Sequence, residues 1–251
     1  MKDQLITSTH PDPPRVIVYG VAGVGKTSVA AQAEAVLIDC ENGAGAIPGL
    51  TRTPYLQDWP SIRSWLVEFV SSPPESRVLA IDTIDWMMRR IIEHVILEMD
   101  PKAKLDDGQF DFKSTLNSAH GGYGRARDIV KNVVWKDLIP LLNRISQQGC
   151  AILLLAHARN GKASDPEGHD INTAQPELDD WIAPAFTEWA DAVLYARREP
   201  DDSRILVTRH RPTIFAKNRY ELPEELPLSW HEITAGISNH FAPQAQEATD
   251  G

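Results

Sequence analysis

The chain has 251 residues, of which 42% are hydrophobic and 24% are charged, and these proportions are typical of one globular domain with a full core. The formal net charge of −10 argues against a protein that coats nucleic acid through bulk positive charge, although a local basic loop is compatible with it. The first residues lack the apolar segment of a signal peptide and no run of about 18 apolar residues occurs, so we expect a cytoplasmic protein without membrane contact.

Six short apolar segments are predicted to be β-strands, at residues 15–20, 35–41, 77–82, 150–157, 191–197 and 204–210. Four of them are almost continuously apolar, which is typical of strands covered on both faces and favours a parallel sheet. Apolar residues recur at helical spacing over 62–70 and 129–142, and Pro140 is expected to kink the second helix. The alternation of strands and helices predicts an α/β fold with a mostly parallel central sheet flanked by helices.

The remaining segments suggest how the chain is organised around this core. We predict a flexible N-terminus over residues 1–14, a core over 15–234 and a disordered tail over 235–251. Residues 100–124 and 158–180 are polar and rich in Gly, Asp, Pro and Asn, and we expect them to form long loops. The two cysteines lie in apolar runs and are expected to be buried free thiols. Cysteine and histidine show no spacing that predicts a zinc site.

The stretch GVAGVGKT at residues 20–27 fits the P-loop pattern G-x-x-x-x-G-K-[ST], and it lies between a predicted strand and a predicted helix. Glycines let such a loop turn its backbone N–H groups toward phosphate oxygens, and the positive end of the following helix adds to the attraction. Lys26 can reach the β- and γ-phosphates, and the Thr27 hydroxyl can bind Mg²⁺. The residues predicted to bind the nucleotide are Gly20, Val21, Ala22, Gly23, Val24, Gly25, Lys26, Thr27 and Ser28.

Acidic residues follow two of the other predicted strands. Asp82 ends an apolar strand at the edge where ligands bind in open α/β sheets, so it is a candidate Mg²⁺ ligand together with Thr27, although an acid there is also a common helix N-cap. Asp39 and Glu41 are two residues apart and would share one face of a strand. One of them is a candidate for activating water, but the pattern alone favours solvent-exposed acids at a strand end.

A strand, a P-loop, a helix and then a strand that ends in Asp-x-Glu together resemble the RecA-like ATPase core. The resemblance implies ATP as the nucleotide and Glu41 as the general base, and it places His157 where that family has a polar γ-phosphate sensor. Histidine at this position resembles the small phage-encoded RecA-like ATPases of single-strand annealing and recombination. The segments GGYGRAR, EWADAVLY and KNRY resemble later blocks of that subgroup, so the resemblance extends over most of the chain. By this resemblance we expect a core-only member, without the large DNA-binding domains of RecA itself.

The segment RHRPTIFAKNRY at residues 209–220 alternates basic residues as on two strands of a ribbon. A solvent-exposed basic edge strand is one interpretation, because charges on edge strands prevent aggregation. The other is that Lys217 and Arg219 act as fingers on the γ-phosphate bound by a neighbouring subunit, where a cation stabilises transition-state charge. The KNR sequence resembles the lysine-x-arginine finger of ring-forming RecA-like proteins. It implies a homo-oligomer, either a ring or a filament.

The two predicted loops combine basic and aromatic residues, which suits single-stranded DNA. Phe112 and Tyr123 are available for stacking on bases, but the second loop also carries many acids, so a merely solvated loop remains an alternative. The basic residues predicted to contact DNA are Arg125, Arg127, Lys131, Arg159 and Lys162.

These inferences combine into one functional prediction. We expect a Mg²⁺-dependent, DNA-stimulated ATPase that acts on single-stranded DNA in recombination or annealing, with a single-strand-binding protein as a possible further partner. The phage origin rests on the resemblance alone. One alternative is a nucleotide-gated assembly or regulatory module without DNA binding. Another is a small-molecule P-loop kinase, which would need an acceptor pocket and no finger from a second subunit.

Overall fold

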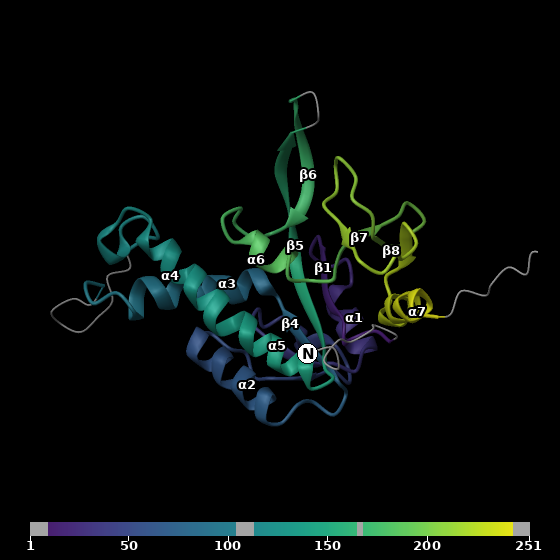
Figure 1. Cartoon of the computed structure of the whole chain (residues 1–251), viewed down its shortest axis with the longest axis horizontal. Coiled ribbons are helices and arrows are strands. Elements are labelled where there is room, and N and C mark those ends of the chain that lie inside the picture. Colours follow the sequence, from purple (N-terminus) through teal and green to yellow (C-terminus); the bar gives the residue numbers. More distant parts are fainter. Residues whose placement is uncertain (1–9, 104–112, 165–167, 243–251) are drawn as a thin grey trace, which may run out of the picture.

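A computed structural model describes residues 10–103, 113–164 and 168–242, and within them a twisted sheet lies between two layers of helices (Figure 1). The sheet has ten strands in the order β10-β8-β7-β1-β5-β4-β2-β3, with β6 paired to β5 and β9 paired to β7. The neighbours from β7 to β3 in this order are parallel, and the pairs formed by β6, β8, β9 and β10 are antiparallel. The predicted α/β class with a mostly parallel sheet is confirmed.

Each of the six apolar segments contains a strand, as predicted. The strands are β1 Arg15–Gly20, β2 Val36–Asp39, β3 Thr51–Arg52, β4 Val78–Asp82, β5 Ala151–Ser164, β6 Asp170–Pro176, β7 Ala192–Arg198, β8 Arg204–Val207, β9 Lys217–Asn218 and β10 Glu225–Pro227. Strand β1 is buried on both faces because its side chains alternate between two cores. Ile17 and Tyr19 face one core, while Val16 and Val18 face the other.

The helices divide between the two faces of the sheet (Figure 1). One face is covered by α2 Trp59–Ser71, α3 Ile84–Glu93, α4 Arg125–Val133 and α5 Ile139–Gln147, and the other by α1 Lys26–Gln32 and α7 Trp230–His240. The short elements are α6 Ala183–Thr187, the 3-10 turns η2 Ala44–Ala46 and η4 Ala119–Gly121, and the π-helical turns η3 His94–Glu98 and η5 Val134–Leu138. The helix expected over 129–142 is interrupted by the widened turn η5, directly before Pro140 in the first turn of α5.

The structure corrects the expected long loop over residues 158–180. Strand β5 continues past the sheet edge to Ser164 and pairs antiparallel with β6, from Ala158 opposite Pro176 to Ser164 opposite Asp170. The resulting hairpin projects away from the sheet (Figure 1). A projecting hairpin has solvent near both faces, so its residues lack the apolar alternation by which strands are recognised.

The boundaries of the core are also corrected. The disordered tail predicted from residue 235 is wrong as far as His240, because α7 includes these residues and buries Ile233 and Ile237. The flexible segment predicted over 1–14 is corrected at its end, where the Pro14 carbonyl accepts a hydrogen bond from the Ile152 N–H at 2.9 Å. Residues 1–9 and 243–251 of these terminal segments, and residues 104–112 of the loop predicted at 100–124, lie outside the described residues.

Two further expectations concern burial and membranes. Cys40 and Cys150 are free and buried, as predicted. In the described ranges, every helix is too short or too polar to cross a membrane.

Candidate nucleotide-binding site

The P-loop connects the end of β1 to the start of α1 at the carboxyl edge of the sheet. Gly20 is required by close packing, since a Cβ atom there would lie 2.5 Å from the Ala196 carbonyl oxygen on β7. Gly25 caps α1 with φ of 111°, a left-handed conformation that favours glycine. The loop therefore takes a shape that its glycines permit, and it lines a cavity of about 330 Å³.

Lys26 begins α1 and is buried beneath this loop. Its Nζ donates hydrogen bonds to the carbonyl oxygens of Gly20 at 3.0 Å and Val21 at 3.2 Å. Burial lowers the pKa of the Lys26 ammonium, while the nearby carboxylates of Asp82 and Asp85 oppose that shift. The loop carbonyls thus hold the ammonium beside the cavity, where phosphate oxygens can replace them as acceptors.

Thr27 and Asp82 both line the same cavity and contact each other there. Thr27 Oγ1 donates a hydrogen bond to Asp82 Oδ2 at 2.8 Å. Burial raises the pKa of Asp82 to about 6, although the hydrogen bond from Thr27 acts in the opposite direction. The N-cap of α3 is Thr83 rather than Asp82, so the N-cap interpretation of Asp82 is wrong. A hydroxyl and a carboxylate oxygen side by side fit the ligands that Mg²⁺ prefers.

The two acids after β2 have separate environments. Asp39 is the last residue of the strand and is fully buried, and its carboxylate accepts hydrogen bonds from the N–H groups of Glu41 at 3.3 Å and Asn42 at 2.6 Å. The other oxygen of Asp39 forms an ion pair with Arg52 at 3.0 Å. Glu41 lies past the end of the strand and lines the cavity, so the expectation that both acids share a strand face is wrong. Asp39 shapes the turn that presents Glu41.

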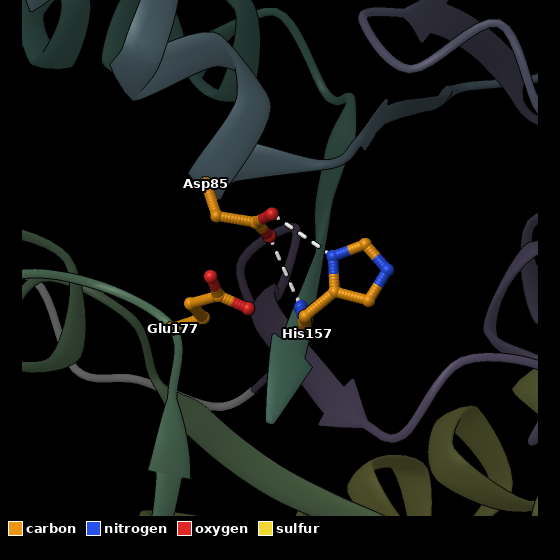
Figure 2. Close-up of side chains that lie close together, drawn as sticks. All are labelled: Asp85, His157 and Glu177. Carbon is orange, nitrogen blue, oxygen red and sulfur yellow. Dashed lines mark hydrogen bonds and ion pairs between the residues drawn. The ribbon is translucent and has the colours of Figure 1, made fainter. Parts of the chain in front are cut away.

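His157 is held by an acid that the sequence analysis missed. Asp85, in the first turn of α3, accepts hydrogen bonds from the His157 backbone N–H at 3.0 Å and from His157 Nδ1 at 2.9 Å (Figure 2). These contacts raise the pKa of His157. Burial alone would raise the pKa of Asp85, but the hydrogen bonds from His157 outweigh it and the pKa of Asp85 is lowered. The remaining ring nitrogen, Nε2, lies 3.7 Å from Glu41 Oε1 at the cavity wall.

Glu177 joins the same network from the base of the hairpin (Figure 2). Among the described residues, Asp85, His157 and Glu177 can bring ligand atoms within 4.8 Å of one another. Each has a partner already, since the Glu177 N–H donates to the His157 carbonyl at 2.8 Å and its carboxylate pairs with Arg89 at 3.2 Å. We interpret the group as a hydrogen-bonded connection between the cavity and the hairpin.

The sequence profile of the AAA domain family matches residues 12–220 of the chain. The chain belongs to the AAA domain family. A search of curated proteins returned no match. The matched region extends from before β1 to just after β9 and so contains the whole cavity. Family membership identifies the chain as a P-loop ATPase that binds nucleotide, in agreement with the coarse form of the sequence prediction.

Lys217 and Arg219 lie at the amino ends of the parallel strands of this AAA domain, beside the start of β7, whereas the P-loop lies at the carboxyl ends. Lys217 Nζ donates to the carbonyl oxygens of Thr187, Glu188 and Ala190, at 3.0, 2.7 and 2.6 Å. These three bonds use all the N–H groups of the ammonium. The two-stranded ribbon predicted over residues 209–220 does not form. Residues 211–214 make a tight turn instead, and the later part of the segment pairs with β7 only through Lys217–Asn218.

Arg219 stabilises the contact between two of the sequence blocks noted above. Its Nη1 pairs with Asp191 Oδ1 at 3.0 Å, and the same carboxylate receives Arg15 Nη2 at 2.7 Å. The segments EWADAVLY and KNRY therefore lie side by side. The Arg219 side chain remains 51% exposed, so the AAA domain leaves part of this guanidinium open to solvent.

The residues predicted to contact DNA belong to two separate elements. Arg125, Arg127 and Lys131 lie on α4, whereas Arg159 and Lys162 lie on the extended part of β5. Several of them are engaged within the AAA domain. The pairs and hydrogen bonds are Arg127 with Asn117, Arg159 with Asp180, and Lys162 with Asp170.

The turn before α4 displays an aromatic ring. Tyr123 is 99% exposed, and the five residues from His120 to Gly124 all have positive φ. The turn is anchored by His120, whose backbone N–H donates to Asp100 Oδ2 at 2.6 Å. Phe112 lies outside the described residues.

Proposed function

We propose that this AAA domain is a Mg²⁺-dependent ATPase that acts on single-stranded DNA in recombination or annealing. The catalytic part of the proposal rests on one observation, the convergence of the P-loop, Asp82, Glu41 and His157 on one cavity. Four separate segments of the chain contribute these groups. Each group has a chemistry that phosphoryl transfer to water requires.

The roles follow from the contacts described above. Lys26 exchanges the carbonyls of Gly20 and Val21 for phosphate oxygens and neutralises their charge. Glu41 accepts the proton of the attacking water, since its carboxylate lines the cavity and is turned toward it by Asp39. His157 donates a hydrogen bond from Nε2 to the γ-phosphate when its ring is protonated on both nitrogens, a form that the Asp85 carboxylate at Nδ1 favours by raising the pKa of His157.

Thr27 and Asp82 are the residues that would hold Mg²⁺. An ion bound there would supply positive charge that offsets the negative charge of the nucleotide phosphates. The Thr27 hydroxyl and the Asp82 carboxylate, 2.8 Å apart, would each present an oxygen ligand to such an ion. The carboxylate of Asp82 is buried, which favours a partner of opposite charge.

A direct test of the ATPase is phosphate release from ATP by the purified full chain, with Mg²⁺ and with EDTA. We expect turnover with Mg²⁺ that EDTA abolishes, and GTP in place of ATP measures the base preference. Absence of turnover under all conditions, with nucleotide binding intact, would favour the regulatory module over the ATPase.

The DNA-binding part of the proposal is supported by the turn before α4. The ring of Tyr123 is fully exposed beside Arg125 and Arg127, and bases of single strands stack on exposed aromatic rings. The resemblance to phage-encoded recombination ATPases supports single-stranded DNA as the substrate. A homo-oligomer is proposed because Arg219 is half exposed and distant from its own P-loop, as a finger acting on a neighbouring subunit must be.

The nucleotide-gated regulatory module without DNA binding remains the second candidate. It is favoured by the pairing of Arg159 with Asp180 and of Lys162 with Asp170, which neutralises charge on the hairpin. Fluorescence anisotropy of a labelled oligonucleotide, with a non-hydrolysable ATP analogue, distinguishes the two. Binding supports the recombination ATPase, and its absence at low salt supports the module.

A further inference from the structure

Arg204 is a cation in the nucleotide cavity that none of the roles above uses. It is the first residue of β8 and lines the cavity together with the P-loop. Within the described parts of the chain, its guanidinium has no hydrogen-bond or ion-pair partner. The arginines at the end of the adjacent strand β7 differ, because Arg197 pairs with Glu199 at 2.7 Å and Arg198 pairs with Asp202.

The Arg204 side chain lies directly against the start of α1. A Cβ atom added to Gly25 would lie 2.8 Å from Arg204 Nη1 and 3.5 Å from its Cδ. The backbone of Arg204 is held in place, since its carbonyl accepts a hydrogen bond from the Leu228 N–H at 2.9 Å. The guanidinium therefore lies beside the last glycine of the P-loop and lines the cavity proposed to bind the nucleotide.

The strand order determines from which side Arg204 approaches the nucleotide. Strand β8 is antiparallel to β7 and pairs Arg204 with Arg198, so the first residue of β8 is level with the carboxyl end of β7. In the sheet, β7 lies on one side of β1, and β5, β4 and β2 lie on the other. Strand β5 carries His157, β4 ends at Asp82, and Glu41 follows β2. Arg204 thus faces the P-loop from the side opposite to the groups assigned to the γ-phosphate and Mg²⁺.

We propose that Arg204 binds the α- and β-phosphates of the nucleotide within the same subunit. The assignment rests on the proposed nucleotide site and extends it by a residue that the P-loop pattern does not include. Guanidinium groups bind phosphate oxygens through two parallel N–H bonds. An unpaired guanidinium beside a P-loop has the geometry and the charge for this contact, and ATP and ADP both carry these phosphates.

The test compares ADP with a non-hydrolysable ATP analogue by isothermal titration calorimetry of the full chain. In Arg204→Ala, the dissociation constants of both ligands should rise by a similar factor of roughly 10-fold or more, as expected for loss of a charge-assisted hydrogen bond. Arg204→Lys should be intermediate, because lysine keeps the charge but loses the planar fork. Arg198→Ala is the matched control, since Arg198 is the cross-strand partner of Arg204 and is ion-paired elsewhere. It should bind both ligands like the wild type.

Two results would overturn the assignment while the proposed function stands. Wild-type affinity of Arg204→Ala for both ligands would show that the guanidinium does not contact the nucleotide. A loss for the ATP analogue alone would assign Arg204 to the γ-phosphate. If wild-type protein with a normal circular dichroism spectrum bound neither ligand, the proposed function and this assignment would fail together.

Discussion

Asp85 accepts two hydrogen bonds from His157, one from the ring Nδ1 at 2.9 Å and one from the backbone N–H at 3.0 Å. The pair fixes the direction of the ring as well as its protonation, because the acceptor is a buried carboxylate. Nε2 is left facing the cavity, 3.7 Å from Glu41. A residue on α3 therefore orients the histidine on β5 that is proposed as the γ-phosphate sensor.

The first prediction concerns this pair. Asp85→Asn keeps the shape of the side chain but removes its charge, so the His157 ring loses its preferred orientation and its raised pKa. ATP turnover should fall roughly 10- to 100-fold, the range seen when a partner that orients a histidine is removed. Asp137→Asn is the control, since Asp137 pairs with Arg63 at the surface. Equal turnover in Asp85→Asn and wild type would contradict a positioning role, and the pKa of His157 measured by NMR would show whether the contact was lost.

The second prediction is a dependence of stability on pH. The pKa of His157 is raised in the folded protein by Asp85. Stabilisation by this pair should therefore be complete below the unfolded value of about 6.5 and should disappear as the pH rises through the raised value. The difference in melting temperature between wild type and His157→Gln should be largest below about pH 6 and should shrink as the pH rises through the raised pKa of His157. A difference that grows with pH would have the wrong sign.

The third prediction concerns the subunit boundary. If Arg219 acts on a neighbouring subunit, mixing Lys26→Ala protein with Arg219→Ala protein should restore part of the ATPase activity that each lacks. The first variant provides intact fingers and the second an intact P-loop. Lys217→Ala is unsuitable for this test, because Lys217 holds three backbone carbonyls and its loss would disturb the fold. Lack of recovery in a mixture shown to co-assemble would point to a structural role for Arg219.

The fourth prediction is that single-stranded DNA binds through the turn before α4. Arg125→Ala combined with Arg127→Ala should weaken binding and flatten its salt dependence, which for single strands is about −0.7 per phosphate contacted. Tyr123→Ala should lower the affinity by roughly 1–3 kcal/mol per stacked base with an unchanged salt slope. Arg209→Ala serves as a control, since Arg209 pairs with Glu224 and is not among the residues predicted to contact DNA. Anisotropy across a salt series measures both quantities, and unchanged binding in the arginine and tyrosine variants would move the DNA contact elsewhere.

The sequence was sufficient to predict features that are local in the chain. The six strands were recognisable because their apolar runs are nearly continuous. The P-loop was recognisable because all of its pattern residues lie within one short stretch of the chain. Asp85 and Arg204 were missed, since their positions depend on which strands and helices lie side by side. Helix α7 was missed although Trp230, Ile233 and Ile237 have helical spacing, because a polar tail surrounds them. The sequence could not distinguish the roles of Asp39 and Glu41, whereas the structure shows that Asp39 is buried and that Glu41 lines the cavity.

The central claim is that Glu41 performs the chemistry in a cavity where Lys26 holds the phosphates. Its most direct test is to measure nucleotide affinity and turnover together in Glu41→Gln and Lys26→Ala. Glu41→Gln should bind ATP like the wild type and hydrolyse it at least ~10²-fold more slowly, as for loss of a general base. Lys26→Ala should lose both properties. Wild-type turnover in Glu41→Gln would contradict the account.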